Sequence, residues 1–169
     1  MRKLYVLLAI AILAAACSAG SGAPGGANNN GGGGGKATID LKTSGAMQGS
    51  TTQLNSYECL GAQFGAFSDT FKPVINGKEY DLGLLLNHVI TTPVSFDLSS
   101  PDSKVLLQLN DLKTGTGGWR NNSDSTGTVK IDAGGDSGTV DAHNLDNGLP
   151  GTFKTKLDLM FTFTCPAKK

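Results

Sequence analysis

The alternation of apolar and polar residues predicts short strands from residue 37 onward. Ala37–Thr43 alternates apolar and polar side chains with a period of two, as a half-buried strand does. Lys154–Cys165 alternates in the same way, with the apolar side chains of Leu157, Leu159, Phe161 and Phe163 on one face. Cys165 is in phase with them, so we expect its side chain to point into the core.

A strand at Glu79–Val89 is expected near the centre of its sheet. One of its faces holds Tyr80, Leu82, Leu84, Leu86 and His88. Leu85 and Val89 fall on the other face, so part of this strand is expected to be covered on both sides. Asn76-Gly77 lies just before it and favours a hairpin, because both central residues of a type I′ turn need positive φ.

The remaining pattern completes an all-β prediction. Further strands are expected at Thr92–Leu98, at Val105–Leu109 and in a hairpin of residues 127–132 and 138–142. Ser50–Phe71 is harder to interpret and predicts a loop or irregular strand, with Tyr57–Leu60 placing Cys59 inward. No window has helical periodicity over three turns. Roughly seven to nine short strands separated by Gly, Asn and Pro turns favour an antiparallel β-sandwich with Greek-key connections. A small barrel is the alternative.

The N-terminus has a different pattern, which is typical of an export signal. Arg2 and Lys3 precede an apolar run of thirteen residues, Leu4–Ala16, which ends directly before Cys17. A helix needs roughly 18 to 20 apolar residues to cross a bilayer, so the run predicts a cleaved signal and not a permanent span. An ordinary secretory signal with a chance cysteine is the alternative.

Residues 18–36 contain almost nothing that could be buried. They combine Gly, Ala, Ser and Asn and end with five glycines, Gly31–Gly35, followed by Lys36. Such a composition behaves as a random coil with an end-to-end distance of about 24 Å, so it predicts a tether. A phosphate-binding loop would need a preceding strand and a Lys followed by Ser or Thr, which this run lacks. The expected organisation is a signal at residues 1–16, a tether at 17–36 and one β domain at 37–169.

Charge and cysteine content indicate which partners and which redox compartment to expect for this protein. The domain holds eleven Lys and Arg and fourteen Asp and Glu, since Arg2, Lys3 and Lys36 precede it. Both signs are interspersed, so the charge pattern argues against a nucleic acid partner. Two of the three cysteines, Cys59 and Cys165, lie in the domain and predict a disulfide in an exported chain. A zinc site is the alternative, and it would need more Cys or His residues at ligand spacing.

The layout resembles that of small bacterial surface lipoproteins. Leu13-Ala14-Ala15-Ala16-Cys17 is similar to a lipobox, although Ala14 stands where Leu is usual. The tether, the Asn-Gly-Lys hairpin, the paired segments of residues 127–142 and the final strand ending in Cys complete the likeness. The chain also resembles the nineteen-kilodalton lipoprotein antigen of mycobacteria in its lipid anchor, its tether and its two domain cysteines. It implies a cysteine diacylated on sulfur as the first mature residue, and a β-sandwich on the outer membrane or cell surface. Ser18 is not the Asp that marks inner-membrane retention in Gram-negative species. The Trp119 loop and Ser50–Phe71 depart from the likeness.

Three groups of residues could carry chemistry in the domain, and each also has a structural explanation. Gly135-Asp136-Ser137-Gly138 is similar to the nucleophile segment of chymotrypsin-like proteases, with His88 and Asp102 or Asp111 earlier in the chain. The domain is too short for two six-stranded barrels, and a hairpin turn between two alternating strands needs these glycines in any case. The second group consists of residues whose side-chain oxygens could bind calcium, although their spacing is not that of a calcium loop: Asp132, Asp136, Asp141, Asn144 and Asp146.

The loop Lys113–Ser125 is the third group. It carries Trp119, Arg120, Asn121 and Asn122, which could stack on a sugar or anchor a protein partner. Trp119 could instead fold back over one end of the domain. No cofactor or metal is expected, and His88 and His143 are isolated in the sequence. We therefore expect a non-enzymatic envelope protein that binds a ligand or has a structural role, with a carbohydrate- or calcium-binding module and a small serine hydrolase using Ser137 as alternatives.

Overall fold

The computed structural model describes residues 35–63, 66–100, 103–113, 118–147 and 155–166. These residues form strands and one short 3-10 turn, η1 (Ala133–Gly135), and none of them lies in an α-helix. The strands are β1 (Thr38–Gly45), β2 (Gly49–Thr51), β3 (Leu54–Gln63), β4 (Ala66–Ile75), β5 (Lys78–Leu86), β6 (Val94–Asp97), β7 (Val105–Asp111), β8 (Trp119–Arg120), β9 (Thr126–Ile131), β10 (Ser137–Asp146) and β11 (Lys156–Thr164). The all-β prediction is confirmed, with more strands than expected.

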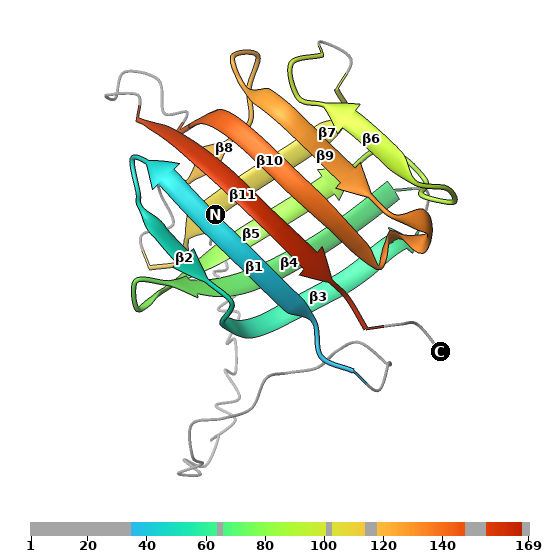
Figure 1. Cartoon of the computed structure of the whole chain (residues 1–169), viewed down its shortest axis with the longest axis horizontal. Coiled ribbons are helices and arrows are strands. Elements are labelled where there is room, and N and C mark those ends of the chain that lie inside the picture. Colours follow the sequence, from blue (N-terminus) through green and yellow to red (C-terminus); the bar gives the residue numbers. More distant parts are fainter. Residues whose placement is uncertain (1–34, 64–65, 101–102, 114–117, 148–154, 167–169) are drawn as a thin grey trace, which may run out of the picture.

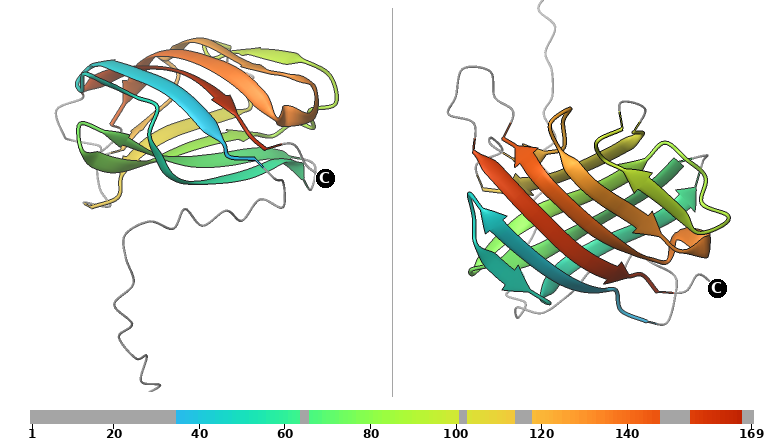
Figure 2. Two further views of the ribbon diagram at one scale, coloured as in Figure 1. Left: turned by 60° about the horizontal axis from the view of Figure 1, so that its bottom comes forward. Right: turned by 45° about the horizontal axis from the view of Figure 1, so that its top comes forward.

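The strands form one curled antiparallel sheet. Its order is β2-β1-β11-β10-β8-β7-β5-β4-β3, with β9 paired to β10 and β6 paired to β9. We call β1, β6, β9, β10 and β11 the front half and β3, β4, β5 and β7 the back half (Figure 1). Figure 2 shows the two halves lying one over the other. The short β8 joins them, because Arg120 pairs with Asp146 of β10 and with Gln108 of β7.

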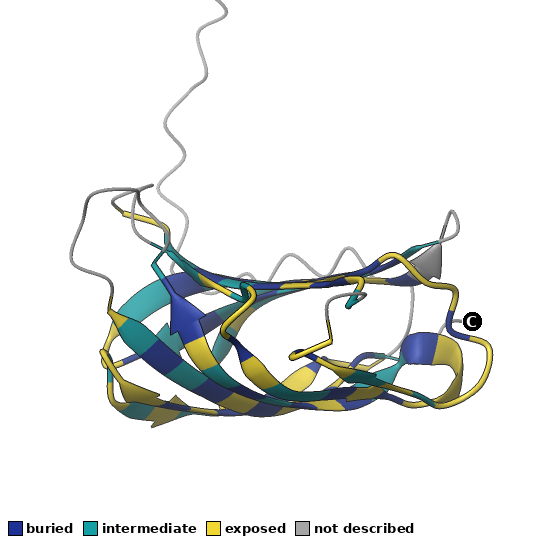
Figure 3. Ribbon diagram, turned by 90° about the horizontal axis from the view of Figure 1, so that it is seen from above, coloured by how far each residue is buried: buried dark blue, intermediate teal, exposed yellow. Residues whose placement is uncertain are grey.

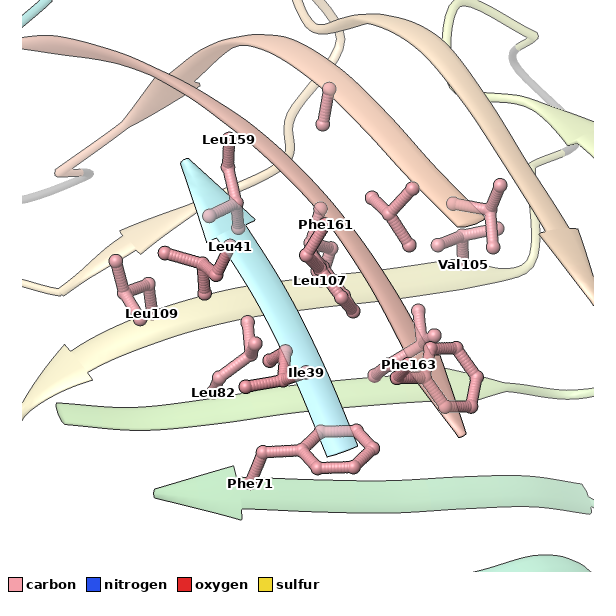
Figure 4. Close-up of a cluster of buried hydrophobic side chains, with 14 of the residues drawn as sticks. Ile39, Leu41, Phe71, Leu82, Val105, Leu107, Leu109, Leu159, Phe161 and Phe163 are labelled. Carbon is pink, nitrogen blue, oxygen red and sulfur yellow. The ribbon is translucent and has the colours of Figure 1, made fainter. Parts of the chain in front are cut away.

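The core lies between the two halves. Along β1, β4 and β11, buried and more exposed residues alternate, so that every second side chain points inward (Figure 3). The inward side chains of both halves meet in one cluster, as Figure 4 shows for Leu41, Leu82 and Phe161 among others. The rings of Phe71 and Phe163 have centroids 5.3 Å apart across the two halves. Leu157, Leu159, Phe161, Phe163 and Cys165 are all buried, which confirms the predicted phase of the last strand.

The central hairpin is also confirmed, with one correction. Asn76 and Gly77 have φ angles of 52° and 77°, so both central residues of the turn between β4 and β5 have positive φ. β5 ends at Leu86, however, and His88 lies beyond it as an exposed residue. The prediction that this strand is covered on both faces is wrong, since Leu85 is 40% exposed and Val89 is 46% exposed. Among the described residues, no second layer covers the outer face of the back half at Leu85.

Ser50–Phe71 is more regular than its sequence suggests. It contains β2, β3 and the start of β4, and Phe67 and Phe71 are fully buried. The predicted disulfide is present between Cys59 of β3 and Cys165, with the Cα atoms 6.0 Å apart. Register shifts in the pairing of β3 with β4 interrupt the alternation in this segment. These irregularities explain why the segment has no clear period in the sequence.

The buried side chain of Asp69 lies at one of these register shifts. Asp69 pairs with Cys59 across β3 and β4, and the pairing shifts between Cys59 and Gly61. The Gly61 backbone N–H donates a hydrogen bond of 3.0 Å to Asp69 Oδ1. The other oxygen, Oδ2, lies 3.5 Å from Cys165 Sγ. The carboxylate therefore satisfies a backbone donor that the shifted strand pairing leaves over.

The hairpin of β9 and β10 confirms another prediction and extends it. Gly127 has a φ of 117°, and a Cβ atom there would lie 1.9 Å from the carbonyl oxygen of Asp141, so only glycine fits. The second strand is longer than the predicted residues 138–142, because β10 continues to Asp146. Asn144 adopts a φ of 60°, and the pairing with β11 shifts between Ala142 and Leu145. This bulge bends β10, so that its first part pairs with β9 and its last residue pairs with β8.

The turn after β6 is stabilised by an acidic side chain at the strand end. Asp97 Oδ1 accepts hydrogen bonds from the hydroxyl and the backbone N–H of Ser99. These two bonds hold the pKa of the Asp97 carboxyl below its usual value. The Asp97 side chain therefore stabilises the start of the turn that follows β6.

Candidate functional site

A hollow of about 310 Å³ lies on the outer face of the front half, where β1, β11 and β10 run side by side. The sheet register places its lining in two cross-strand rows. Lys42, Met160 and Asp141 form one row, and Asp40, Thr162 and Thr139 form the next. Every second residue of a strand points outward, so these six side chains share one face.

The hollow combines an apolar floor with polar sides. Met160 is 43% exposed and stands on the middle strand. Asp40 and Lys42 stand on one side of it, while Thr139 and Asp141 stand on the other. Small-molecule sites are usually concave and largely apolar, with a few polar groups that orient the ligand. The volume of the hollow lies at the small end of the usual range for ligand sites, roughly 300 to 1,000 Å³.

An imidazole lies beside the hollow. His143 of β10 has Nε2 3.1 Å from Asp141 Oδ1 and Nδ1 3.5 Å from Asp158 Oδ1. Asp158 Oδ1 also accepts a hydrogen bond of 3.0 Å from the Asn144 backbone N–H. His143 is isolated in the sequence, but in the fold Asp141 of its own strand and Asp158 of β11 bring two carboxylates to its ring. All three side chains are partly exposed, so the contacts are exposed and weak ion pairs at most.

Trp119, the centre of the ligand loop predicted from sequence, packs on the protein itself. Its side chain is half-buried against the core cluster. Its indole N–H donates a hydrogen bond of 3.2 Å to Thr155 Oγ1. This position is the one expected for a side chain that covers one end of the domain. An indole that is already in contact with the core offers less of its face for stacking on a sugar.

The neighbours of Trp119 also have structural roles. The Asn121 side chain accepts from the Leu107 N–H at 2.8 Å and donates to the Val105 carbonyl at 2.9 Å, so it occupies the edge of β7. Asn122 accepts from the Asp124 N–H at 2.8 Å and shapes the turn that follows. Arg120 differs from them, since it is exposed. The four predicted residues therefore lie together in the fold, but the side chains of Trp119, Asn121 and Asn122 are engaged in contacts within the domain.

The residues proposed for a serine hydrolase have other contacts. The Ser137 hydroxyl donates to the Asp132 carboxylate across the turn that contains η1. His88 lies with its ring 5.7 Å from the Phe96 ring, in an edge-to-face contact. Asp111 forms an ion pair with Lys78 at the other end of β5, and this contact raises the pKa of the Lys78 amine. Asp102 lies outside the described residues. The described contacts of Ser137 and His88 thus do not join the hydroxyl to the imidazole.

The candidate calcium ligands are not gathered in space. Asp132 contacts Ser137, Asp141 contacts His143, and Asp146 is buried 3.6 Å from Lys156 Nζ. Among the described residues, one group of acidic, His and Cys side chains brings its ligand atoms within 4.8 Å of one another: Cys59, Asp69 and Cys165. Its two sulfurs are bonded to each other, which excludes the thiolates that a zinc site would require.

No family model, curated protein or solved structure matches this chain.

The predicted lipid attachment site, Cys17, lies outside the described residues. Within the described ranges, no helix is both long enough and apolar enough to cross a membrane. The hollow beside Met160 was not predicted from the sequence. The alternation of each strand does indicate which of its side chains point outward. It does not indicate that the first strand of the domain pairs with the last, and this pairing creates the hollow.

Proposed function

We propose that this chain is a lipid-anchored protein of the bacterial cell envelope, attached to a membrane through Cys17, whose β domain binds a ligand and does not catalyse a reaction. One observation carries the proposal. The disulfide uses Cys59 and Cys165, which leaves Cys17 as the third cysteine of the chain. Disulfides persist in oxidising compartments outside the cytosol. The pairing thus supports export, and it leaves Cys17 available for acylation.

The arrangement of the two halves supports a two-layer β-sandwich as the architecture of this domain. The connection from β5 to β6 passes from the back half to the front half, and the connection from β6 to β7 returns. Such crossings are typical of Greek-key connections in sandwiches. The link through β8 would also suit the small barrel, so the sandwich and its Greek-key connections form part of the proposal.

The anchor can be tested by metabolic labelling. Bacteria that produce the full chain are supplied with an alkyne-bearing palmitate, and the purified protein is analysed by mass spectrometry. We expect the label on a mature N-terminal Cys17, and its complete loss in Cys17→Ser. The matched control Ser18→Ala keeps the label. An unmodified mature N-terminus in the parent chain would overturn the proposal.

A second candidate function places a small polar ligand, such as a sugar, in the hollow of the front half. The observation that favours it is the pair of cross-strand rows around Met160. Carboxylates and hydroxyls can bind the hydroxyl groups of a sugar, and the exposed methionine can contact its C–H face. The proposal therefore places the ligand against Asp40, Asp141 and Thr162, away from Trp119.

A glycan array followed by calorimetry on the strongest hit tests this second function. We expect Asp141→Asn to weaken binding at least about tenfold, because the loss of one hydrogen bond to a charged group costs about 1.5 to 3 kcal/mol. The control Asp124→Asn removes an exposed carboxylate elsewhere and leaves binding unchanged. Binding that survives Asp141→Asn but is lost in Trp119→Ala would assign the ligand to the Trp119 loop instead.

A further inference from the structure

The outer face of the back half carries a row of exposed leucines. Leu85 of β5 and Leu106 of β7 are each 40% exposed and lie directly opposite each other in the sheet. Ser68 of β4 is the next partner of Leu85. Leu60 of β3 is 38% exposed and lies in the bulge beside the pair of Gly61 and Ser68. We call Leu60, Leu85 and Leu106 the apolar row.

A shallow hollow adjoins the apolar row. It has a volume of about 170 Å³, and its lining includes Leu85, Leu106 and Gly83. Gly83 presents no side chain on this face, and a Cβ atom there would lie 3.3 Å from the Gln108 side chain. The row is therefore a low, open surface on a sheet. It has no deep groove that would hold a helix or an extended peptide by its side chains.

The chain enters the domain at β3, the strand that carries Leu60. The Gly35 carbonyl accepts a hydrogen bond of 3.4 Å from the Tyr57 hydroxyl of β3. Tyr57 lies in the same strand as Leu60, and Cys59 between them is bonded to Cys165. The tether predicted from the sequence thus joins the fold at the strand that carries Leu60 of the apolar row. A Gly-rich tether between Cys17 and Gly35 has an expected reach of about 23 Å.

We propose that the apolar row rests on the surface of the bilayer to which Cys17 is anchored. This inference depends on the lipid anchor of the proposed function. The short tether keeps the domain at a high effective concentration near the bilayer, so a small contact area is sufficient for binding. A flat row of leucines can enter the interfacial region of a bilayer, where apolar side chains are buried among the acyl chains.

Area and charge favour a bilayer over a second copy of the chain. A stable protein interface buries about 1,200 to 2,000 Å² in total, which a single row of part-exposed leucines does not offer. Two exposed charged residues flank the row, Lys104 before β7 and Glu58 in β3, and they have opposite signs. The surface therefore has no strong preference for anionic lipid, and phosphatidylcholine is the appropriate probe.

Lipid photo-crosslinking tests the inference on the acylated full chain. The protein is reconstituted in phosphatidylcholine vesicles that contain a diazirine-bearing acyl chain, and the labelled peptides are identified by mass spectrometry. We expect the peptides with Leu85 and Leu106 to carry several-fold more label than the peptide with Met160, which is 43% exposed on the opposite outer face. The variant Leu85→Ser/Leu106→Ser should lose this preference, and the control Met160→Ser should keep it.

The possible failures can be told apart in the same samples. An acylated N-terminal peptide combined with equal labelling of both outer faces overturns the inference and leaves the anchor intact. A non-acylated N-terminus in the parent chain overturns the anchor itself. A lipid-free dimer that Leu85→Ser/Leu106→Ser dissociates, measured by analytical ultracentrifugation, would assign the row to a second copy and overturn its contact with the bilayer.

Discussion

The two ends of β11 are joined to the rest of the protein by different kinds of interaction. At the C-terminal end, Cys165 is covalently bonded to Cys59 of β3, 106 residues earlier in the chain. At the N-terminal end, Thr155 and Lys156 make polar contacts with Trp119 and Asp146. We call these the disulfide end and the Trp119 end. One end carries a covalent bond between distant residues, and the other is held by weak polar contacts.

This difference separates two ways of stabilising a curled sheet. A disulfide acts largely by restricting the unfolded chain, and in the chain-entropy model its effect grows with the size of the loop it closes. The contacts at the Trp119 end exist only in the folded state. Each contributes a modest net free energy, since folding exchanges bonds with water for bonds within the protein. Removing one of them should therefore cost less than removing the disulfide.

The largest expected effect is at the disulfide end. Cys59→Ser/Cys165→Ser should lower the free energy of unfolding by about 3 to 5 kcal/mol, because the loop between these cysteines is long. Urea unfolding followed by circular dichroism measures the change. Cys17→Ser is the matched control, since it removes a cysteine and leaves the disulfide intact. An unchanged urea midpoint in the double variant would show that the bond contributes nothing to stability.

A smaller effect is expected for the polar contacts that accompany the Trp119 end. Asn121→Ala removes the side-chain bonds to the Leu107 N–H and the Val105 carbonyl on the edge of β7. We expect a loss of about 1 to 3 kcal/mol in the free energy of unfolding, because backbone groups that were bonded lose their partners.

The control for this prediction is Asn87→Ala. Asn87 is exposed, and its backbone N–H bonds the Lys104 carbonyl, which the substitution leaves in place. The same urea titration should give an unchanged midpoint for this variant. If Asn121→Ala proves as mild as Asn87→Ala, the stability of the β7 edge does not depend on the asparagine side chain. If it proves as severe as the loss of the disulfide, the two ends are equally important.

Periodicity located most of the strands from the sequence, but it did not reveal how they associate. The alternation of β11 predicted which of its side chains are buried, and Asn76-Gly77 predicted the turn of the central hairpin. The irregular pairing of β3 with β4 could not be predicted from the sequence, because a shifted register breaks the period of two. The extension of β10 past Asn144 was missed for the same reason, since a bulge residue with positive φ looks like the start of a loop.

Two surface features likewise depend on the tertiary structure. The exposure of Leu85 was predicted wrongly, because an apolar residue on the second face of a strand looks the same whether or not a layer covers it. The ring of His143 lies near carboxylates from its own strand and from β11, and the second of these contacts depends on strand pairing.

The sequence by itself determined the all-β class, the inward phase of the last strand and the pairing of the two domain cysteines. These follow from local periodicity and from the even number of cysteines left when Cys17 is set aside. The tertiary structure alone decided that β1 lies beside β11, that the sheet curls over its own back half, and which outer faces carry the hollow and the apolar row. Those features depend on contacts between residues far apart in the chain, and a period of two carries no information about which strand lies next to which.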